Sequence, residues 1–143
     1  MPLAPSKAAG LIKDETGAQS LIGYVVDVGG GDGCGRCWLD IGPQHLNRHG
    51  MLHGGIAAAL LDNASGTTGS LSVDASGKVP FLTVSLTTQF IAPIGAGRVT
   101  ATGRLMGGGR SLLYIDAQLH CDAGRLIASS TGVFKKVPAE RLT

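Results

Sequence analysis

The pattern of apolar and polar residues along the chain predicts one buried helix followed by a series of strands. Within residues 53–70, Ile56, Leu60 and Ala64 recur at the spacing of one helical face, in a segment rich in alanine and leucine. Alanine also occupies other sides of this segment, so we expect the helix to be deeply buried and covered by a sheet.

Four segments after the helix show the period-two alternation of β-strands. They span residues 81–90, 98–106, 111–121 and 125–137. Turn residues separate them, as Pro93 and Gly124 illustrate. In the first segment we expect one polar face and one apolar face, the apolar one formed by Leu82, Val84, Leu86 and Phe90.

Two further strands are predicted before the helix. Residues 21–28 and 34–41 have the composition of strands, and the glycine-rich run 29–33 between them predicts a hairpin turn. We expect residues 1–19 to form an N-terminal arm or a short helix. The element order predicts an α+β fold in a single domain of residues 1–143, with an antiparallel sheet of about six strands wrapped around one central helix.

Length and composition fit one domain and narrow the classes of function. Of the 143 residues, 43% are apolar, which is enough for a hydrophobic core. The net charge is only +2 and the basic residues are scattered, so we expect no nucleic-acid partner. No apolar run approaches the roughly 20 residues that span a bilayer, and three cysteines argue against a disulfide framework. We therefore expect a cytoplasmic protein that has no membrane contact.

Two motifs near the glycine-rich run resemble sites of other protein classes. Residues 25–33 are similar to the glycine loop of nucleotide-dependent methyltransferases, but that loop requires a helix after it, and residues 34–43 are poor helix formers. Cys34 and Cys37 have the spacing of a metal or redox pair. On a strand, residues three apart point to opposite faces, so we expect no metal site here.

The chemically suggestive stretch lies at the start of the helix. Gly54 and Gly55 are expected in the first turn, where unhindered backbone N–H groups stabilise a developing negative charge. Asp62 lies further along the same helix between apolar residues, where a partly desolvated carboxylate can act as a general base or a nucleophile. This combination suggests chemistry on an acyl group.

Helix geometry keeps these two groups apart. Gly54 and Asp62 are eight residues apart, so they lie about 12 Å apart along the helix axis, too far to act on one carbonyl carbon. We therefore predict that Gly54 of one subunit acts with Asp62 of the partner subunit across a two-fold interface, where antiparallel helices form two equivalent sites.

A set of spaced residues begins before the helix and continues into the next strand. It comprises Asn47, Gly50, His53, Gly54, Gly55, Asp62 and the strand entry Thr83-Val84-Ser85. This pattern resembles the hotdog-fold thioesterases, specifically the phenylacetate-pathway-like acyl-CoA thioesterases, and the element order matches over roughly residues 20–137. The resemblance implies hydrolysis of a coenzyme A thioester, without metal or other cofactor, by a homodimer or by a homotetramer made of two dimers.

The family also implies roles for individual residues. Gly54 would direct its backbone N–H at the thioester carbonyl, and Asp62 would be the general base or nucleophile. Asn47 and His53 would position the substrate, the water or the loop. Thr83 stands where related enzymes often carry a hydroxyl group that assists water.

The basic half of the chain offers a site for the coenzyme A phosphates. Residues 72–143 hold eight Lys and Arg against four Asp and Glu. Within this half, Gly109, Arg110 and Ser111 combine free N–H groups with a guanidinium group at a strand junction. A glycine bulge with a surface arginine is the alternative interpretation of the same residues.

Two other functions stay open on the sequence. A hotdog hydratase or dehydratase would need His53 or His49 to face the Asp62 carboxylate across the pocket, and a non-catalytic acyl-CoA-binding protein would need no base at all. The sequence leaves the acyl group open among aryl, hydroxyaryl and aliphatic classes.

Overall fold

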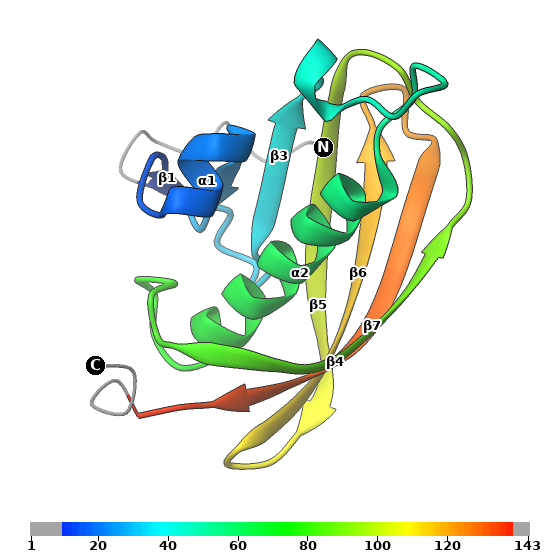
Figure 1. The fold of residues 1–143 in the computed structure, drawn as a ribbon. Coiled ribbons are helices and arrows are strands. Elements are labelled where there is room, and N and C mark those ends of the chain that lie inside the picture. The colour runs from blue at the N-terminus through cyan, green and yellow to red at the C-terminus, as the bar shows by residue number, and fades with distance from the viewer. Residues whose placement is uncertain (1–9, 139–143) are drawn as a thin grey trace.

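The computed structural model describes residues 10–138 and shows one antiparallel sheet curled around a long helix (Figure 1). The helical elements are α1 (Gly17–Ile22), the 3-10 turn η2 (Pro43–His45) and α2 (Gly54–Leu71). The strands are β1 (Leu11–Ile12), β2 (Val25–Asp27), β3 (Arg36–Asp40), β4 (Phe81–Phe90), β5 (Arg98–Gly108), β6 (Leu112–Cys121) and β7 (Leu126–Lys136). The predicted hotdog fold is confirmed, with seven strands in the order β1-β2-β3-β5-β6-β7-β4.

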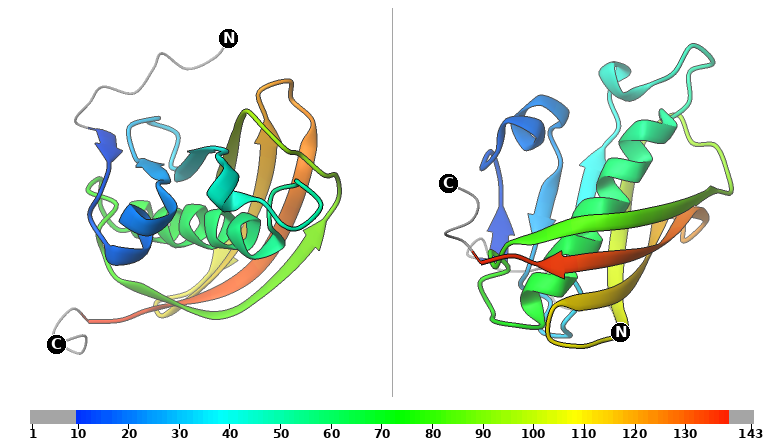
Figure 2. Two further views of the ribbon diagram at one scale, coloured as in Figure 1. Left: turned by 45° about the horizontal axis from the view of Figure 1, so that its top comes forward. Right: turned by 60° about the horizontal axis from the view of Figure 1, so that its bottom comes forward.

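The central helix is buried because small and apolar residues face the sheet. Leu60, Leu61 and Ala64 have no exposed surface. Gly103 of β5 permits the close approach, because a Cβ atom there would lie 2.6 Å from the backbone oxygen of Ala64. Figure 2 shows from two further directions how β4 and β7 curl around α2.

The N-terminal region differs from the predicted hairpin. Leu21 lies in the helix α1 and not in a strand, because Thr16 and Gly23 define the two ends of that helix. The Thr16 hydroxyl oxygen accepts a hydrogen bond from the Gln19 N–H at 3.1 Å, and Gly23 ends the helix with φ of 91°. The strand that follows shortens to β2, and β1 pairs with it as a seventh strand. Of the arm or short helix predicted for residues 1–19, residues 1–9 lie outside the described residues.

Strand β4 departs from the strict alternation expected for residues 81–90. In a regular strand, residues an odd number of positions apart point to opposite faces. Thr83 and Phe90 have such a spacing, yet both contact α2. The register shifts between Thr83 and Ser85, so Val84 is an extra residue that reverses the side-chain phase after it. Leu82 and Val84 are 51% and 59% exposed, and the prediction of one apolar face for the whole strand is therefore wrong.

The glycine-rich run is a hairpin turn between β2 and β3, as predicted. Asp32 forms an ion pair of 2.6 Å with Arg36 across this turn, and a hydrogen bond from Arg36 lowers the pKa of Asp32 to about 2. Cys37 is fully buried on β3, and this burial raises the pKa of its thiol, whereas Cys34 is half-buried before the strand. Within residues 10–138, no cluster of three or more His, Cys, Asp or Glu side chains is placed to hold a metal ion.

Candidate active site

The first turn of α2 leaves one backbone N–H group available. His53 is the N-cap residue, and its Nδ1 atom accepts a hydrogen bond from the Gly55 N–H at 2.9 Å. The next two N–H groups, of Ile56 and Ala57, donate to the His53 carbonyl oxygen. The Gly54 N–H, by contrast, has no acceptor among residues 10–138.

This arrangement refines two sequence predictions. Gly55 was expected to offer its N–H to the substrate, but the His53 ring already accepts that hydrogen bond. With Nδ1 as an acceptor, a neutral His53 ring carries its proton on Nε2. His53 therefore positions the start of the helix, and Gly54 is left as the single free donor of this turn.

Asn47 braces the loop that leads into α2. Its Oδ1 atom accepts hydrogen bonds from the backbone N–H groups of His49 and Met51, at 2.9 and 3.2 Å. Its own N–H donates to the Met51 carbonyl oxygen at 2.7 Å. Because these contacts are all made inside the loop, Asn47 holds the loop in one shape and leaves its amide N–H groups free beside the cavity described next.

An apolar cavity of about 440 Å³ adjoins Gly54. Its walls come from the loop before α2, the end of β4, the segment that follows β4 and the start of β7. The Phe90 ring forms the wall next to Gly54, since a Cβ atom on that glycine would lie 3.3 Å from the ring. The other apolar lining residues are Met51, Leu52, Ala57, Ile91, Ala92, Pro93, Ile94, Ile127 and Ala128, and none of the lining residues is acidic, lysine or arginine.

Asp62 lies beside a second and more polar cavity of about 270 Å³. The Thr83 hydroxyl donates a hydrogen bond of 2.6 Å to its Oδ1 atom, so the helix and β4 together orient the carboxylate. Asp62 is half-buried on the single chain and lines the cavity, and its second oxygen has no hydrogen-bond donor among residues 10–138. Lys78 and Glu15 form an ion pair of 2.8 Å on another wall of this cavity.

The structure thus brings together some of the predicted site residues and separates others. Asp62 and Thr83 meet within one chain, and Asn47, His53 and Gly54 gather at the start of α2. Gly54 and Asp62 line different cavities, as their spacing on the helix predicts. His49 lines the Gly54 cavity and not the Asp62 cavity, so the acid–histidine pair of a hydratase is not formed within this chain.

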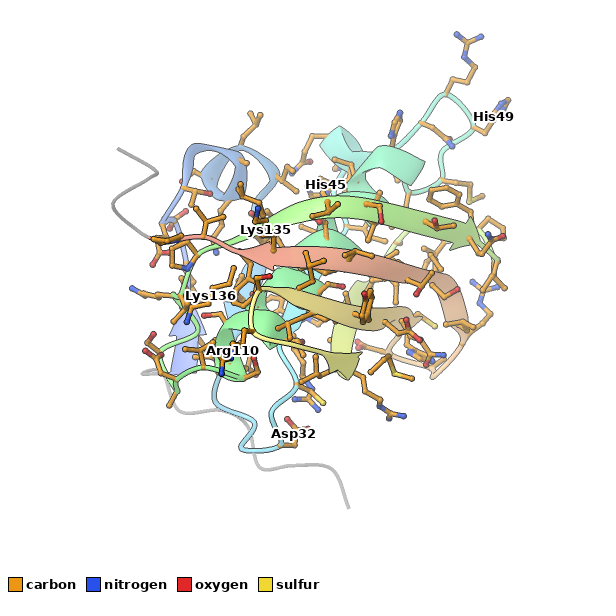
Figure 3. The ribbon with its side chains drawn as sticks, turned by 90° about the horizontal axis from the view of Figure 1, so that it is seen from below. Asp32, His45, His49, Arg110, Lys135 and Lys136 are labelled. Carbon is orange, nitrogen blue, oxygen red and sulfur yellow. The ribbon has the colours of Figure 1, made fainter. Side chains whose placement is uncertain are left out.

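Gly109, Arg110 and Ser111 form the exposed turn between β5 and β6. The Gly109 N–H donates to the Leu112 carbonyl oxygen, so this glycine closes the turn and its N–H is not available to an anion. The Ser111 carbonyl oxygen accepts from the Lys136 N–H at 2.9 Å, which ties the turn to the end of β7. Figure 3 shows Arg110, Lys135 and Lys136 toward one end of the sheet and His49 at the opposite end.

Phe90 is the wall residue that sequence reasoning missed. Within an alternating strand it was assigned to the same apolar face as Leu82, and only the bulge at Val84 turns it toward Gly54. Lys78 and Glu15 were also missed, because residues 63 positions apart carry no sequence signal of their contact.

Comparison with known proteins identifies the family to which the chain belongs. Residues 49–128 match the family model of the thioesterase superfamily, which covers more than half of the chain. The chain belongs to the thioesterase superfamily and is a thioester hydrolase of the hotdog fold. A comparison with curated proteins gave no match.

Solved structures of the same fold are similar to this chain over most of its length. A thioesterase from Haemophilus influenzae has a TM-score of 0.77 at 18% identity, covering 86% of this chain and 84% of that one. The PaaI protein of the Escherichia coli phenylacetic acid degradation operon has a TM-score of 0.71 at 18% identity, with coverage of 87% and 86%. A Bacillus halodurans protein solved with CoA has a TM-score of 0.63 at 27% identity, with coverage of 71% and 66%.

Proposed function

We propose that the protein hydrolyses an acyl-CoA thioester to the free acid and coenzyme A. The Gly54 N–H of one subunit donates a hydrogen bond to the thioester carbonyl oxygen as that oxygen becomes negative, and Asp62 of the partner subunit acts as the general base for water or as the nucleophile. The C–S bond breaks when the tetrahedral intermediate collapses, and the thiolate leaves and takes up a proton as free coenzyme A. With Asp62 as the base, water has by then supplied the oxygen of the free acid; with Asp62 as the nucleophile, water next hydrolyses the acyl–Asp62 anhydride to release the acid.

The observation that carries this proposal is the pair of complementary half-sites on one helix. One half-site offers an unused N–H donor beside an apolar cavity, and the other offers a carboxylate held by a hydroxyl group. Hydrolysis of a thioester needs a group of each kind, on opposite sides of the same carbonyl carbon. Gly54 and Asp62 of a single chain cannot meet this requirement.

Strand β4 offers the means of joining the two half-sites. It is an edge strand of ten residues that pairs only with β7 among the described strands, and Leu82 and Val84 on it are more than half exposed. An edge of this length is suited to pairing with a second strand. A second copy of the chain can supply that strand, in antiparallel orientation about a two-fold axis.

The register of this pairing follows from the contacts of β4 with α2. Gly54 lies against Phe90, whereas Asp62 is bonded to Thr83. Val84 is the extra residue of the bulge and takes up no pairing position, so if the two-fold axis passes through Thr87, near the middle of β4, Phe90 lies opposite Thr83 of the partner subunit. The same arrangement brings Gly54 next to Asp62 of the partner subunit and completes two equivalent sites in a homodimer.

The basic turn at Arg110 is proposed to bind the coenzyme A phosphates. Arg110, Lys135 and Lys136 have no acidic partner among residues 10–138, so their charges are available to an anion. The relative from Bacillus halodurans was solved with CoA, which supports coenzyme A as the ligand class. Guanidinium and ammonium groups bind phosphate oxygens by charge-assisted hydrogen bonds.

Replacement of Asp62 by asparagine tests the proposal. Asp62→Asn keeps the shape of the side chain and an oxygen that can accept from Thr83, but it removes the base, so the rate of thiol release from an acyl-CoA should fall about 10²- to 10⁴-fold. Calorimetry should show that the variant still binds the thioester, because the cavities are unchanged.

A matched control is available on the outer face of the sheet. Asp116 also accepts a hydrogen bond from a threonine hydroxyl, that of Thr131 at 2.7 Å, but it lies outside both half-sites. Asp116→Asn should leave thiol release close to the wild-type rate. If the Asp62→Asn variant instead released thiol at the wild-type rate, Asp62 would not be the base.

A further inference from the structure

The outer face of the sheet carries an apolar surface beside the basic turn. In β6, Ile115 and Ala117 are buried toward α2, so Leu112 and Tyr114 point to the opposite, outer face. Leu112 is 37% exposed and Tyr114 is 50% exposed. Large apolar side chains exposed next to one another on a sheet indicate a binding surface.

Neighbouring strands extend this surface, because directly paired residues share a face of the sheet. Tyr114 pairs with Val133 of β7, and Leu112 pairs with Lys135, which in turn pairs with Leu82 of β4. We define the apolar platform as Leu82, Leu112, Tyr114 and Val133. Lys135 projects from the middle of it.

Positive charge borders the apolar platform. Arg110 comes two residues before Leu112 in the turn, and the Lys136 N–H is bonded to the Ser111 carbonyl oxygen, so the turn and the end of β7 lie together. Figure 3 shows Arg110 and Lys135 toward the same end of the molecule. An aromatic ring beside unpaired cations is complementary to a nucleotide, whose base stacks on the ring while its phosphates contact the cations.

We propose that the apolar platform binds the adenine ring of coenzyme A, stacked on Tyr114, with the phosphates held by Arg110 and Lys135. This inference rests on the proposed function. Tyr114 lies on β6, two strands and about 10 Å from β4, so this base site is separate from the reaction centre at Asp62 and Thr83. Because Tyr114 points to the outer face and Thr83 points to α2, the pantetheine arm of coenzyme A runs around the end of the sheet from the base to the thioester.

Adenosine 3′,5′-bisphosphate, the nucleotide part of coenzyme A, is the direct probe of this site. Calorimetry should show that it binds the wild-type protein and that Tyr114→Ala weakens binding about tenfold, because stacking of a base on an aromatic ring is lost. Tyr114→Phe keeps the ring and should bind as the wild type does. Leu105→Ala is the matched control, since Leu105 is an exposed apolar residue of the same hairpin that pairs with Ile115 on the inner face.

Steady-state kinetics separate this inference from the proposed function. For an acyl-CoA, Tyr114→Ala should raise KM about tenfold, whereas KM for the same acyl group on pantetheine should not change. An equal rise in KM for both substrates, or unchanged binding of the bisphosphate, would overturn the adenine site. If the bisphosphate binds through Tyr114 but no thioester is hydrolysed, the adenine site stands and the proposed function fails.

Discussion

At the residue scale, the site is defined by which polar groups are already hydrogen-bonded. The His53 ring uses the Gly55 N–H and Asn47 uses two N–H groups of its own loop, so Gly54 keeps the free donor. A donor fixed in advance needs no rearrangement when charge develops on the substrate oxygen. The neighbours of Gly54 therefore matter mainly because they hold that N–H in place.

Gly54→Pro tests the donor directly. Proline is favoured at the first position of a helix, and His53 before it already has the extended conformation, with φ of −62° and ψ of 133°, that a following proline requires. We expect the helix to persist and the rate of thiol release to fall about 10²- to 10³-fold, because the N–H donor is removed.

Gly54→Ala is the control for added bulk. Its Cβ atom would lie 3.3 Å from the Phe90 ring, as would that of the proline, but the N–H remains. Its kcat should stay well above that of Gly54→Pro, with circular dichroism confirming helix content in both variants. Equal kcat values in the two variants would show that the N–H has no role.

At this scale the sequence predicts most of the chemical groups of the site, but not which of their N–H groups are already hydrogen-bonded within the chain. Gly54, Asp62 and Thr83 stand out by residue type and spacing, and the structure pairs Asp62 with Thr83. That the Gly55 N–H is already used could not be inferred, because it depends on the rotamer of His53. Histidine is also not among the preferred N-cap residues, so the motif gave no sign of it.

At the element scale, a single bulge in β4 determines which side chains reach α2. Without the extra residue Val84, Thr83 and Phe90 would lie on opposite faces. Either the Gly54 half-site would lose its Phe90 wall, or the Asp62 half-site would lose the Thr83 hydroxyl group. Bulges are difficult to predict from one sequence, because a strand of alternating residues looks the same with or without one. The long helix and the approximate limits of β4, β5, β6 and β7 were predictable, since each of these elements extends over ten or more residues.

The β2–β3 hairpin carries a prediction about stability. The pKa of Asp32 falls from 3.8 to about 2, first because of its hydrogen bond from Arg36. The carboxylate therefore stabilises the folded state above pH 3.8, and this contribution disappears as the pH falls toward 2. Because the pair is near the surface, Asp32→Asn should lower the free energy of unfolding by at most about 1 kcal/mol at pH 7.

Urea unfolding of the wild type and of Asp32→Asn at pH 7 and near pH 3 measures this effect. The difference between the two proteins should shrink at the lower pH, and Arg36→Gln should show a similar loss at pH 7, because it breaks the same ion pair. A difference that is independent of pH would assign the effect to the hairpin backbone and not to the ion pair.

At the scale of the whole molecule, the proposed sharing of each site between two chains can be tested with mixtures of variants. Gly54→Pro and Asp62→Asn should each be inactive as homodimers. In a mixed dimer, the unchanged Gly54 of one chain meets the unchanged Asp62 of the other, so one of the two sites is restored. Random pairing should then return about a quarter of the wild-type activity per chain.

The experiment is to unfold the two variants together, refold them as a mixture and measure thiol release, with separately refolded variants as the baseline. Sedimentation equilibrium on the same samples reports whether dimers form. Dimers that show no recovery of activity would mean that Gly54 and Asp62 do not share a site across the interface. A wholly monomeric active protein would exclude the shared site altogether.

Residue order alone predicts the central helix, strands β4 to β7, the fold class and the candidate chemical groups. These depend on periodicity, on glycine and proline positions and on residue types at fixed spacing, all of which are properties of short stretches of chain. Even the separation of Gly54 from Asp62 followed from the rise of a helix. The packing of distant segments, by contrast, places Phe90 in the wall of the apolar cavity, the Thr83 hydroxyl on Asp62, and Leu112 and Tyr114 on the surface beside Arg110. Each of these depends on a bulge, a rotamer or a register between strands distant in sequence, so no local pattern encodes it.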